Sequence, residues 1–310
     1  MRLPRPTLEK LQDVIQKPAF RQSPLKVISR ITKWQIIRLF KQPIVFNFDN
    51  SLWMKLYPDE DDVATRTYYY DYHEPKIFNF LDRYLKEGMT YVDVGANIGV
   101  YTLFAAKRVG TRGKVFAFEP QEKTFSRLTE NIKISKIENI TAEKVAIGEK
   151  EGEIEIVTDE NYSSISYTKH IDSNKPAKNV AKVITLDAYF EAKEVNNIDY
   201  LKIDVEGFEF YVILGAKEIL KTKIPAIIQL ELIERFQKRS GSSTQMICQL
   251  LNELGYQFFY LEENSLKPAP PYNQKKANDK IYDENDILAI HETKIQHILQ
   301  KLEMSEVIRE

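Results

Sequence analysis

The spacing of hydrophobic positions changes along the chain near Lys76. Before that point, apolar side chains recur at helical spacing over Lys26–Phe40, which predicts an amphipathic helix. The apolar stretches 44–48 and 51–57 flank Asp49-Asn50 and predict a β-hairpin. From Lys76 onward, short apolar runs alternate with amphipathic segments. That alternation is typical of strands that are connected by helices.

The alternating part of the chain yields a set of expected elements. The expected strands are 91–94, 114–118, 140–145, 153–157 at an edge, 182–186, 200–203, 226–232, 257–261 and 286–290. The expected helices are 77–85, 100–108, 123–134, 186–192, 210–220, 244–254 and 293–302. The polar segment 161–180 is weakly patterned and is expected to be a loop. Together these elements predict an α/β fold with a doubly wound, mostly parallel sheet and helices on both faces.

The same division of the chain predicts three parts. We expect an N-terminal basic extension with a helix and a hairpin over 1–70, a main domain over 71–291 and a C-terminal helix over 292–310. A chain of 310 residues is long enough for one large domain with such appendages. Prolines at 4, 6, 18 and 24 break the first stretch of the extension into short pieces.

Composition narrows the class of protein. Charged residues make up 29% of the chain, which is ordinary for a soluble globular protein. The single cysteine, Cys248, excludes an internal disulfide framework and suits a reducing compartment. No stretch approaches the roughly 18 apolar residues that a membrane-spanning helix needs, and the N-terminus has no apolar signal-peptide core. A cytoplasmic location is therefore expected.

The charge of the chain is unevenly distributed. Residues 1–41 contain ten cationic side chains and two acidic ones, a net charge of +8, which leaves −9 for the remainder. A basic arm on an acidic body could contact a lipid surface, a nucleic acid or an acidic partner. The simpler interpretation is that these charges form the solvated face of an additional helix.

A glycine-containing turn follows the first expected strand after Lys76. Residues 93–99 read DVGANIG, in which Gly95 and Gly99 permit a tight turn and let a ligand approach the backbone. Glu119 ends the second strand, 20 residues after Gly99, the spacing at which a carboxylate can accept both hydroxyls of a ribose. Ligands of doubly wound sheets bind outside the carboxyl ends of strands, where the strand order reverses. The pattern therefore predicts a cofactor that contains a ribose.

The spacing of the glycines favours S-adenosylmethionine over a dinucleotide. A pyrophosphate is bound by G-x-G-x-x-G at a helix N-terminus without competing negative charge, whereas this turn is G-x-x-x-G and opens with Asp93. An acid is unfavourable beside a pyrophosphate but suits the cationic ammonium and sulfonium groups of S-adenosylmethionine. An NAD-dependent oxidoreductase or epimerase is the nearest alternative.

Two further segments extend the predicted site. Residues 145–148 end the third strand, where an adenine ring would rest. Asp204 and Glu206 follow the apolar strand Tyr200–Ile203, and this topology places them over the methyl group. Buried carboxylates cost free energy unless they are paired, so two acids at the end of an apolar strand indicate a functional site. The alternative is that one of them caps the helix that begins near Phe208.

These motifs resemble those of the FkbM-type methyltransferases. The matching segments are residues 72–75 (YHEP), 91–102 (YVDVGANIGVYT), 118–120 (FEP), 145–148 (VAIG), 186–187 (LD) and 203–207 (IDVEG). The resemblance covers roughly residues 70–262 and implies a class I, Rossmann-like methyltransferase fold with a seven-stranded sheet. It also implies O-methylation of a hydroxyl on a sugar, glycolipid or polyketide-like natural product, with S-adenosylmethionine as methyl donor.

The resemblance implies a role for each matching residue. The cofactor-binding residues would be Asp93, Gly95, Asn97, Gly99, Tyr101, Glu119, Pro120, Ala146 and Asp204. The substrate-binding residues would be Tyr72, His73, Glu74 and Glu206. Asp204 and Glu206 would also be the catalytic residues, with one of them orienting and deprotonating the acceptor hydroxyl.

Three residue groups keep more than one interpretation. Many family members have a residue other than histidine at the position of His73. His73 could be a general base in the cleft or a partly buried residue beside it. The tyrosines between 68 and 72 could line a substrate cleft or pack the N-terminal segment onto the body. No histidine–cysteine cluster suggests zinc, and no metal is expected. Magnesium at Asp204 and Glu206 is a minor alternative.

The expected partner is a small-molecule or glycan hydroxyl acceptor. Nucleic acid is not expected, because the body is acidic and lacks the Asn/Asp-Pro-Pro-aromatic motif of amino-group methylases. A non-catalytic binding module that acts through the basic arm is a further alternative. The presence of both glycines and both acids argues against a loss of cofactor binding. The oligomeric state does not follow from the sequence.

Overall fold

Two parts of the chain fold as separate units, Met1–Pro75 and Lys76–Glu310. The computed structural model describes residues 14–15, 17–49, 51–58, 62–72, 74–158, 166–170, 179–195, 197–222, 225–262, 265–272, 281–282 and 286–302. The predicted boundaries after residues 70 and 291 stay a prediction. No helix among these residues is long and apolar enough to cross a lipid bilayer.

The N-terminal unit combines helices with one hairpin. Its elements are α2 (Pro18–Gln22), α3 (Pro24–Phe40), β1 (Ile44–Asp49), β2 (Leu52–Leu56) and α4 (Asp62–Tyr70). The amphipathic helix and the hairpin predicted from the sequence are confirmed, and β1 pairs antiparallel with β2. α3 begins with a proline, whose fixed φ suits the first helical position, and ends at Lys41 in the left-handed region (φ 52°).

Tyr68, Tyr69 and Tyr70 lie in the last turn of helix α4, and Tyr72 follows it. The sequence pattern did not predict this helix. The Tyr68 ring stacks on Trp34 with a centroid distance of 4.9 Å and contacts Phe46 at 5.1 Å. The Trp34 indole N–H donates to the Thr65 hydroxyl at 3.1 Å. Tyr68 therefore packs the interior of the N-terminal unit, and a role of these tyrosines in a substrate cleft stays a prediction.

An eight-stranded sheet forms the centre of the second unit, in the order β13-β12-β14-β11-β10-β3-β4-β5. The strands are β3 (Thr90–Val94), β4 (Lys114–Phe118), β5 (Ile140–Glu143), β10 (Tyr200–Ile203), β11 (Ile227–Leu230), β12 (Tyr256–Glu262), β13 (Ser265–Pro268) and β14 (Ile287–His291). The neighbouring strands from β11 to β5 pair in parallel, and β14, β12 and β13 pair antiparallel. The predicted fold class is confirmed, with β13 as an eighth strand that the apolar pattern did not indicate.

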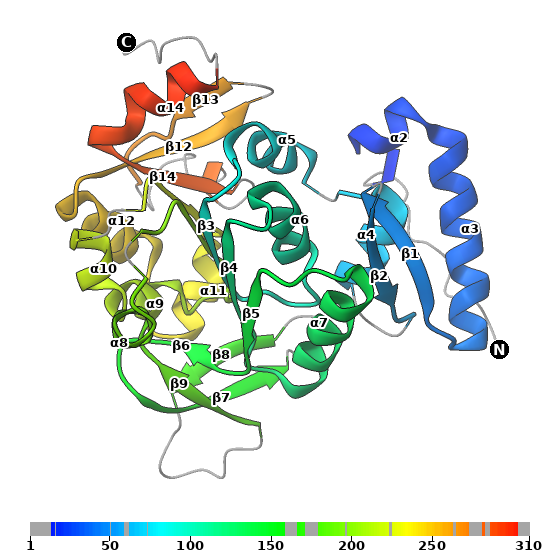
Figure 1. Ribbon diagram of the computed structural model, residues 1–310, viewed down its shortest axis with the longest axis horizontal. Helices are drawn as coiled ribbons and strands as arrows, with labels where there is room; N and C mark the ends of the chain where they lie inside the picture. Colours follow the sequence, from blue (N-terminus) through cyan, green and yellow to red (C-terminus); the bar gives the residue numbers. More distant parts are fainter. Residues whose placement is uncertain are drawn as a thin grey trace. The chain divides into compact units, whose positions relative to one another are not determined.

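Helices cover both faces of this sheet, as Figure 1 shows. α5 (Pro75–Tyr84), α6 (Val100–Val109) and α7 (Glu122–Ser135) lie on one side. α8 (Leu186–Ala192), α9 (Glu209–Leu214), α10 (Lys217–Thr222) and α12 (Thr244–Glu253) lie on the other. α11 (Glu234–Arg239) was not predicted, and the chain continues past β14 into η1 (Glu292–Lys294) and α14 (Ile295–Lys301).

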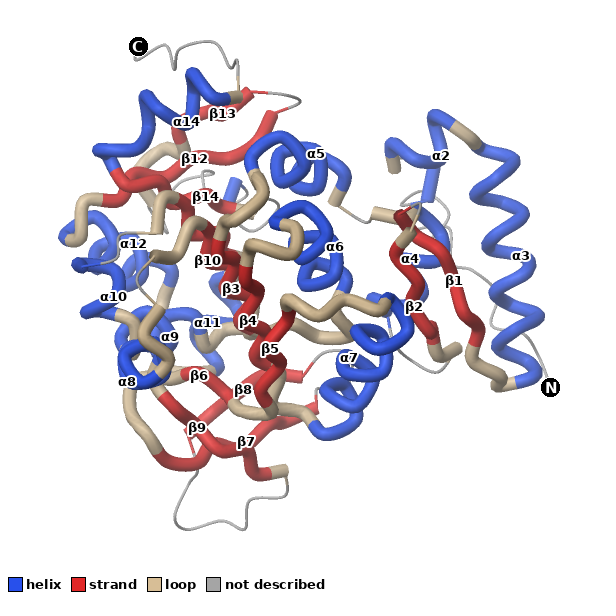
Figure 2. Tube along the Cα trace, in the orientation of Figure 1, coloured by secondary structure: helices blue, strands red, loops and turns tan. Residues whose placement is uncertain are grey.

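A second, four-stranded sheet corrects part of the sequence prediction (Figure 2). Its strands are β6 (Ala146–Ile147), β7 (Gly152–Thr158), β8 (Ser166–His170) and β9 (Val180–Ile184), in the order β6-β9-β7-β8. The predicted edge strand at 153–157 is therefore an inner strand of another sheet, and the predicted strand at 182–186 is β9. Ile154, Ile156, Ala181 and Val183 of these strands form a separate small core with Phe208, whereas Ile184 at the end of β9 packs against the main core. Within the predicted loop 161–180, β8 is a strand, while 161–165 and 171–178 lie outside the described residues.

The predicted helix 210–220 is divided into α9 and α10. Gly215 separates them, and a Cβ at this position would lie 1.9 Å from the carbonyl oxygen of Gly148. The backbone of the helical segment therefore has to approach residue 148 closely, and the hydrophobic periodicity of the segment does not reveal that contact.

The order of strands reverses between β3 and β10. From β3 the chain moves outward to β4 and β5, whereas from β10 it moves outward to β11 on the opposite side. Val94 pairs with Phe118 on one side and with Ile203 on the other, so three strands end at the same level. In parallel sheets this reversal opens a crevice beyond the carboxyl ends, and the predicted site residues follow these strands.

Candidate functional site

The turn after β3 is fixed by contacts that leave no room for a side chain at its first glycine. Gly95 adopts φ 84°, and its N–H and that of Ala96 both donate to the Phe118 carbonyl at 3.0 Å. A Cβ on Gly95 would lie 1.8 Å from the carbonyl oxygen of Asp204. The turn after β3 is thus packed directly on the segment that follows β10. Residue 95 must be glycine because its φ is positive and because a Cβ would collide with the Asp204 carbonyl.

Glu119 supports the same turn from the end of β4. One of its carboxylate oxygens accepts the Asn97 N–H and the other accepts the Gln121 N–H, each at 3.0 Å. Burial raises the pKa of Glu119 to about 7, and these two backbone donors oppose the shift. A carboxylate oxygen can accept more than one hydrogen bond, so each retains capacity for a ribose hydroxyl. The predicted ribose-binding residue therefore also organises the turn.

The end of the turn leads into α6. Gly99 has φ 96°, and a Cβ there would lie 2.7 Å from the Leu128 side chain. The Asn131 side-chain amide donates to the Ile98 carbonyl at 2.9 Å, and the exposed Asn97 has φ 52°. The predicted residues Gly95, Asn97 and Gly99 therefore belong to one turn with a defined backbone conformation.

Asp93 lies behind the turn and is fully buried. One carboxylate oxygen accepts the Thr102 hydroxyl at 2.6 Å, and the other lies 3.5 Å from the Lys202 ammonium. Burial raises the pKa of Asp93, while Lys202 and Thr102 oppose the rise. Its charge is thus compensated from within the chain. Direct contact between Asp93 and the cationic methyl donor stays a prediction.

Lys202 is a site residue that the sequence analysis missed. Its side chain is only 4% exposed, and its ammonium lies 3.0 Å from Asp204 and 4.9 Å from the centroid of the Tyr101 ring. Lys202 therefore connects Asp93 at the end of β3 with Asp204 after β10. The signal in the sequence is a lysine within an otherwise apolar strand, because a buried ammonium needs paired carboxylates.

The turn after β10 contains a second strained position. Glu206 has φ 54°, which is uncommon for a residue with a side chain, and Gly207 has φ 103°. The buried Glu209 carboxylate accepts the N–H groups of Val205 and Gly207 at 3.1 and 3.2 Å, and burial raises its pKa to about 7. The first turn of α9 carries this acid, and its N-cap, Phe208, makes no side-chain cap bond. Neither Asp204 nor Glu206 is therefore the helix cap considered from the sequence.

Glu206 presents a carboxylate that the described part of the chain does not use. Its Oε2 atom is buried and has no hydrogen-bond partner among the described residues. Burial, followed by the neighbouring charges of Asp204 and Glu209, raises the pKa of Glu206 to about 8. A carboxylate with this pKa exchanges a proton near neutral pH, as a general base must.

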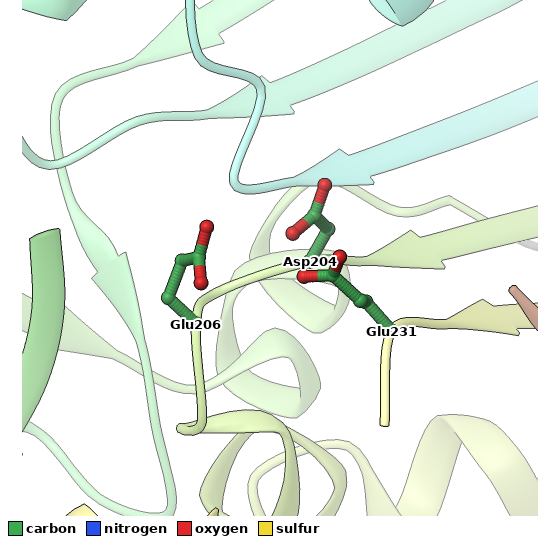
Figure 3. A group of neighbouring side chains, drawn as sticks. All are labelled: Asp204, Glu206 and Glu231. Atoms are coloured by element: carbon green, nitrogen blue, oxygen red, sulfur yellow. The ribbon is translucent and has the colours of Figure 1, made fainter. Parts of the chain in front are cut away.

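A third acid, Glu231, joins this group from the end of β11, as Figure 3 shows. Single carboxylate oxygens of Asp204, Glu206 and Glu231 lie within 4.8 Å of one another. The sequence signal for Glu231 resembles that for Asp204, an acid directly after a buried apolar strand.

The three carboxylates could meet a divalent cation, since Mg²⁺ prefers oxygen ligands. The Lys202 ammonium already lies 3.0 Å from Asp204, however, and neutralises part of the charge that a divalent cation would need. We assign no metal to this group, and the predicted absence of a metal stays a prediction.

A small pocket lies between the glycine turn and the second sheet. Gly95, Pro120 and Ala146 line it together with Val205 and Phe208. Three residues predicted to bind the cofactor thus share one apolar pocket. It lies where the adenine ring was predicted to rest. Phe208 was not predicted, although its buried ring forms one wall.

The predicted substrate residues at 72–74 belong to the N-terminal unit. Tyr72 is half-buried and its ring meets the Phe48 ring edge-on at 6.1 Å, and Glu74 is half-buried as well. His73 lies outside the described residues, so its predicted role as a base stays a prediction. Their roles in substrate binding also stay predictions.

A family model described as the Methyltransferase FkbM domain matches residues 93–258, more than half of the chain. The chain therefore belongs to the FkbM methyltransferase family. This result confirms the resemblance found in the sequence, and with it S-adenosylmethionine as the predicted cofactor.

Individual relatives match part of the chain. Methyltransferase 1 of Beauveria bassiana is 26% identical over 145 residues, which cover 40% of this chain and 57% of that protein. The hexuronic acid methyltransferase AglP of Haloferax volcanii is 28% identical over 161 residues, which cover 52% of this chain and 60% of that protein. The chain thus spans less than two thirds of the length of either relative.

Solved structures of methyltransferases show a weak overall likeness. The FkbM methyltransferase of Methylobacillus flagellatus is 13% identical, with coverage of 86% of this chain and 60% of that chain and a TM-score of 0.43. An O-methyltransferase of Thermotoga maritima is 15% identical, with coverage of 71% and 65% and a TM-score of 0.37. Both TM-scores lie below 0.5.

Proposed function

We propose that this member of the FkbM methyltransferase family transfers the methyl group of S-adenosylmethionine to a hydroxyl of a sugar, glycolipid or polyketide-like natural product. The observation that carries the proposal is Glu206, a buried carboxylate with an unused oxygen and a pKa of about 8. It follows β10, next to the strand that carries the glycine turn, so a base and a donor site share one crevice.

The donor is held by the groups around the glycine turn. Glu119 accepts the ribose hydroxyls, and the adenine contacts the apolar surface that Pro120 and Ala146 form. The carboxylates of Asp204, Glu206 and Glu231 together outnumber the Lys202 ammonium, and the excess negative charge faces the sulfonium and ammonium groups. S-adenosylmethionine supplies an activated methyl group, and the protein has to align it with the acceptor oxygen and exclude water.

A hydroxyl acceptor needs a base because an alcohol is a poor nucleophile. In the transfer, the bond between the acceptor oxygen and the methyl carbon forms while the bond between sulfur and carbon breaks. The hydroxyl proton passes to Glu206, and the positive charge on sulfur disappears. A bound sulfonium favours the ionised carboxylate, so donor binding prepares the base.

The group of carboxylates around Glu206 offers several hydrogen-bond acceptors, which suits an acceptor substrate with several hydroxyls. Asp204, Glu206 and Glu231 present carboxylate oxygens from the ends of two neighbouring strands. Adjacent hydroxyls of a sugar ring can donate to such oxygens while one of them is methylated. The name of the related hexuronic acid methyltransferase supports a sugar as the first class of acceptor to examine.

The experiment is the substitution Glu206→Gln, which keeps the shape of the side chain but removes the base. Methyl transfer from radiolabelled S-adenosylmethionine to a panel of methyl glycosides and methyl uronosides is measured together with donor affinity. We expect the rate to fall by about 10²–10⁴-fold, with donor affinity changed by less than about threefold. Glu253→Gln, an exposed acid on α12, is the matched control.

Two results would contradict the proposal. One is a Glu206→Gln variant that methylates hydroxyls at the wild-type rate. The other is a wild-type protein that binds S-adenosylmethionine but methylates only amino groups when aminosugars are included in the panel. A protein that binds NAD and not S-adenosylmethionine would instead favour the oxidoreductase alternative.

A further inference from the structure

Helix α3 of the N-terminal unit has two apolar faces. One face packs inward through Val27, which is 2% exposed, and Trp34, which is fully buried. The indole of Trp34 donates to Thr65 and its ring stacks on Tyr68, so this face joins α3 to α4. A single inward face is all that an amphipathic helix of a globular unit requires.

The other face of α3 is apolar and exposed to solvent. Its members, which we call the exposed stripe, are Leu25, Ile28, Ile36, Leu39 and Phe40, with 50–83% of each residue exposed. Their spacing of three, eight, three and one residues keeps them on one side of a helix with 3.6 residues per turn. Val27 and Trp34 lie about half a turn away from that side. Exposed apolar side chains gathered in this way mark an interaction surface.

The exposed stripe lies in the most basic part of the chain. Residues 14–48 contain seven lysines and arginines and no acid, although the whole chain has a net charge of −1. On α3, Lys26 and Arg30 pair with Asp71. Lys33 borders the stripe and Arg38 lies on the side of Val27; both are exposed and form no ion pair within the described residues. A surface that is both apolar and cationic is complementary to a partner that is both apolar and anionic.

We propose that the exposed stripe of α3 binds the surface of an anionic lipid bilayer, with the helix lying in the plane of the headgroups. Leu25, Ile36 and Phe40 would enter the boundary of the acyl chains, and Lys33, which borders the stripe, would contact lipid phosphates, while Arg38 would add to the attraction from a greater distance. A nucleic acid would satisfy the cations but would leave the apolar residues in water. The inference rests on the N-terminal unit alone and does not depend on the proposed methyl transfer.

The test uses the full chain and sedimentation with vesicles of phosphatidylcholine, either pure or with about 40 mol% phosphatidylserine. The double substitution Ile36→Ser with Leu39→Ser removes two residues of the stripe that make no part of the core. Val180→Ser with Met246→Ser is the matched control, because these are exposed apolar residues of the second unit. Circular dichroism and thermal unfolding verify that every variant is folded.

The wild-type protein and the control pair should bind the anionic vesicles at least about tenfold more tightly than the neutral ones. The stripe variant should lose about tenfold or more of that affinity. Lys33→Gln with Arg38→Gln should remove most of the preference for anionic lipid, and added salt should weaken wild-type binding.

Each contrary result is informative. Equal binding of the wild-type protein and the stripe variant would overturn the proposal, as would no binding to either vesicle. A wild-type dimer that becomes a monomer in the stripe variant, without vesicle binding, would assign the stripe to contacts between copies of the chain. Binding of single-stranded RNA that requires Lys33 and Arg38 but not Ile36 and Leu39, in the absence of lipid binding, would also overturn it.

Discussion

The two turns at the centre of the sheet are built alike but present different chemistry. The turn after β3 places Asn97 at φ 52°, and the turn after β10 places Glu206 at φ 54°. A buried glutamate supports each of them by accepting backbone N–H groups, Glu119 in the first turn and Glu209 in the second. Burial raises the pKa of both supporting acids to about 7.

The difference between the turns lies in which polar groups remain available. In the first turn the Asn97 side chain accepts the Ile98 N–H at 2.7 Å, so the strained residue is satisfied locally. In the second turn the strained residue carries a buried oxygen without a partner among the described residues. The first arrangement suits a turn that only binds the cofactor. The second suits a side chain that takes up a proton during the reaction. Strain combined with an unused titratable group is typical of active sites.

The largest effect is predicted for a substitution that breaks the contact between the two turns. Gly95→Ala would place a methyl group 1.8 Å from the Asp204 carbonyl oxygen at a position with φ 84°. We expect a loss of about 4 kcal/mol or more in unfolding free energy, or at least about a hundredfold loss of donor affinity if the fold survives. Thermal unfolding and calorimetric titration with S-adenosylmethionine measure the two quantities.

Gly88→Ala separates the steric contribution from the backbone strain. Gly88 also has a left-handed conformation, with φ 89°, but nothing lies within 4 Å of the added Cβ. Gly88→Ala should lower the unfolding free energy by only about 1–2 kcal/mol and leave donor affinity unchanged. Equal effects of the two substitutions would show that the close packing of the turns is unimportant.

The sequence predicted the first turn better than the second. Gly95, Gly99 and Glu119 follow from local spacing, because a glycine turn and an acid about 20 residues later lie on consecutive strands. Lys202 and Glu231 acquire their meaning only from neighbouring strands. Lys202 pairs with Asp93 through the register of β10 with β3, and Glu231 follows β11, a later strand. Pairing between distant segments is not encoded in hydrophobic periodicity.

The same reason explains the errors in the fold. The inner part of the main sheet was predicted strand by strand because its strands are short, buried and bounded by helices. The second sheet was not predicted, since β7 and β9 alternate apolar and polar residues in a way that fits any sheet edge. Their pairing with each other and the packing of most of their apolar side chains on Phe208 distinguish them from strands of the main sheet.

The second prediction removes the link between the turns while their backbones stay intact. Lys202→Met leaves Asp93 fully buried without a cation, and breaking a buried pair in this way costs about 3–5 kcal/mol. Thermal unfolding measures the loss. Thr102→Val is a milder companion that removes only the 2.6 Å hydrogen bond to Asp93, at about 1–3 kcal/mol. If Lys202→Met were as stable as the wild-type protein, Lys202 would not be the link between the turns.

The third prediction concerns the pH dependence of the second turn. Because a base must be ionised and the pKa of Glu206 is raised to about 8 in the donor-free protein, kcat/KM for S-adenosylmethionine should rise with pH below about 8 and level off above it. The residual activity of Glu206→Gln should lack this rise. Lys202 lowers the pKa of Glu206, so Lys202→Met, if folded, should move the midpoint to higher pH. A wild-type profile that is flat between pH 6 and pH 9 would contradict the assignment of Glu206 as the base.

The smallest predicted effect distinguishes a base from a metal ligand in the second turn. Asp204, Glu206 and Glu231 are close enough to share a cation, but the Lys202 ammonium already provides positive charge 3.0 Å from Asp204. We therefore expect dialysis against EDTA, followed by assay with and without added Mg²⁺, to leave methyl transfer within about twofold of its starting rate. Lys202→Met sharpens the test, because loss of the ammonium should increase any affinity of the three acids for Mg²⁺. If EDTA abolished wild-type activity and Mg²⁺ restored it, the second turn would hold a metal, and the two turns would then differ as metal site and cofactor site.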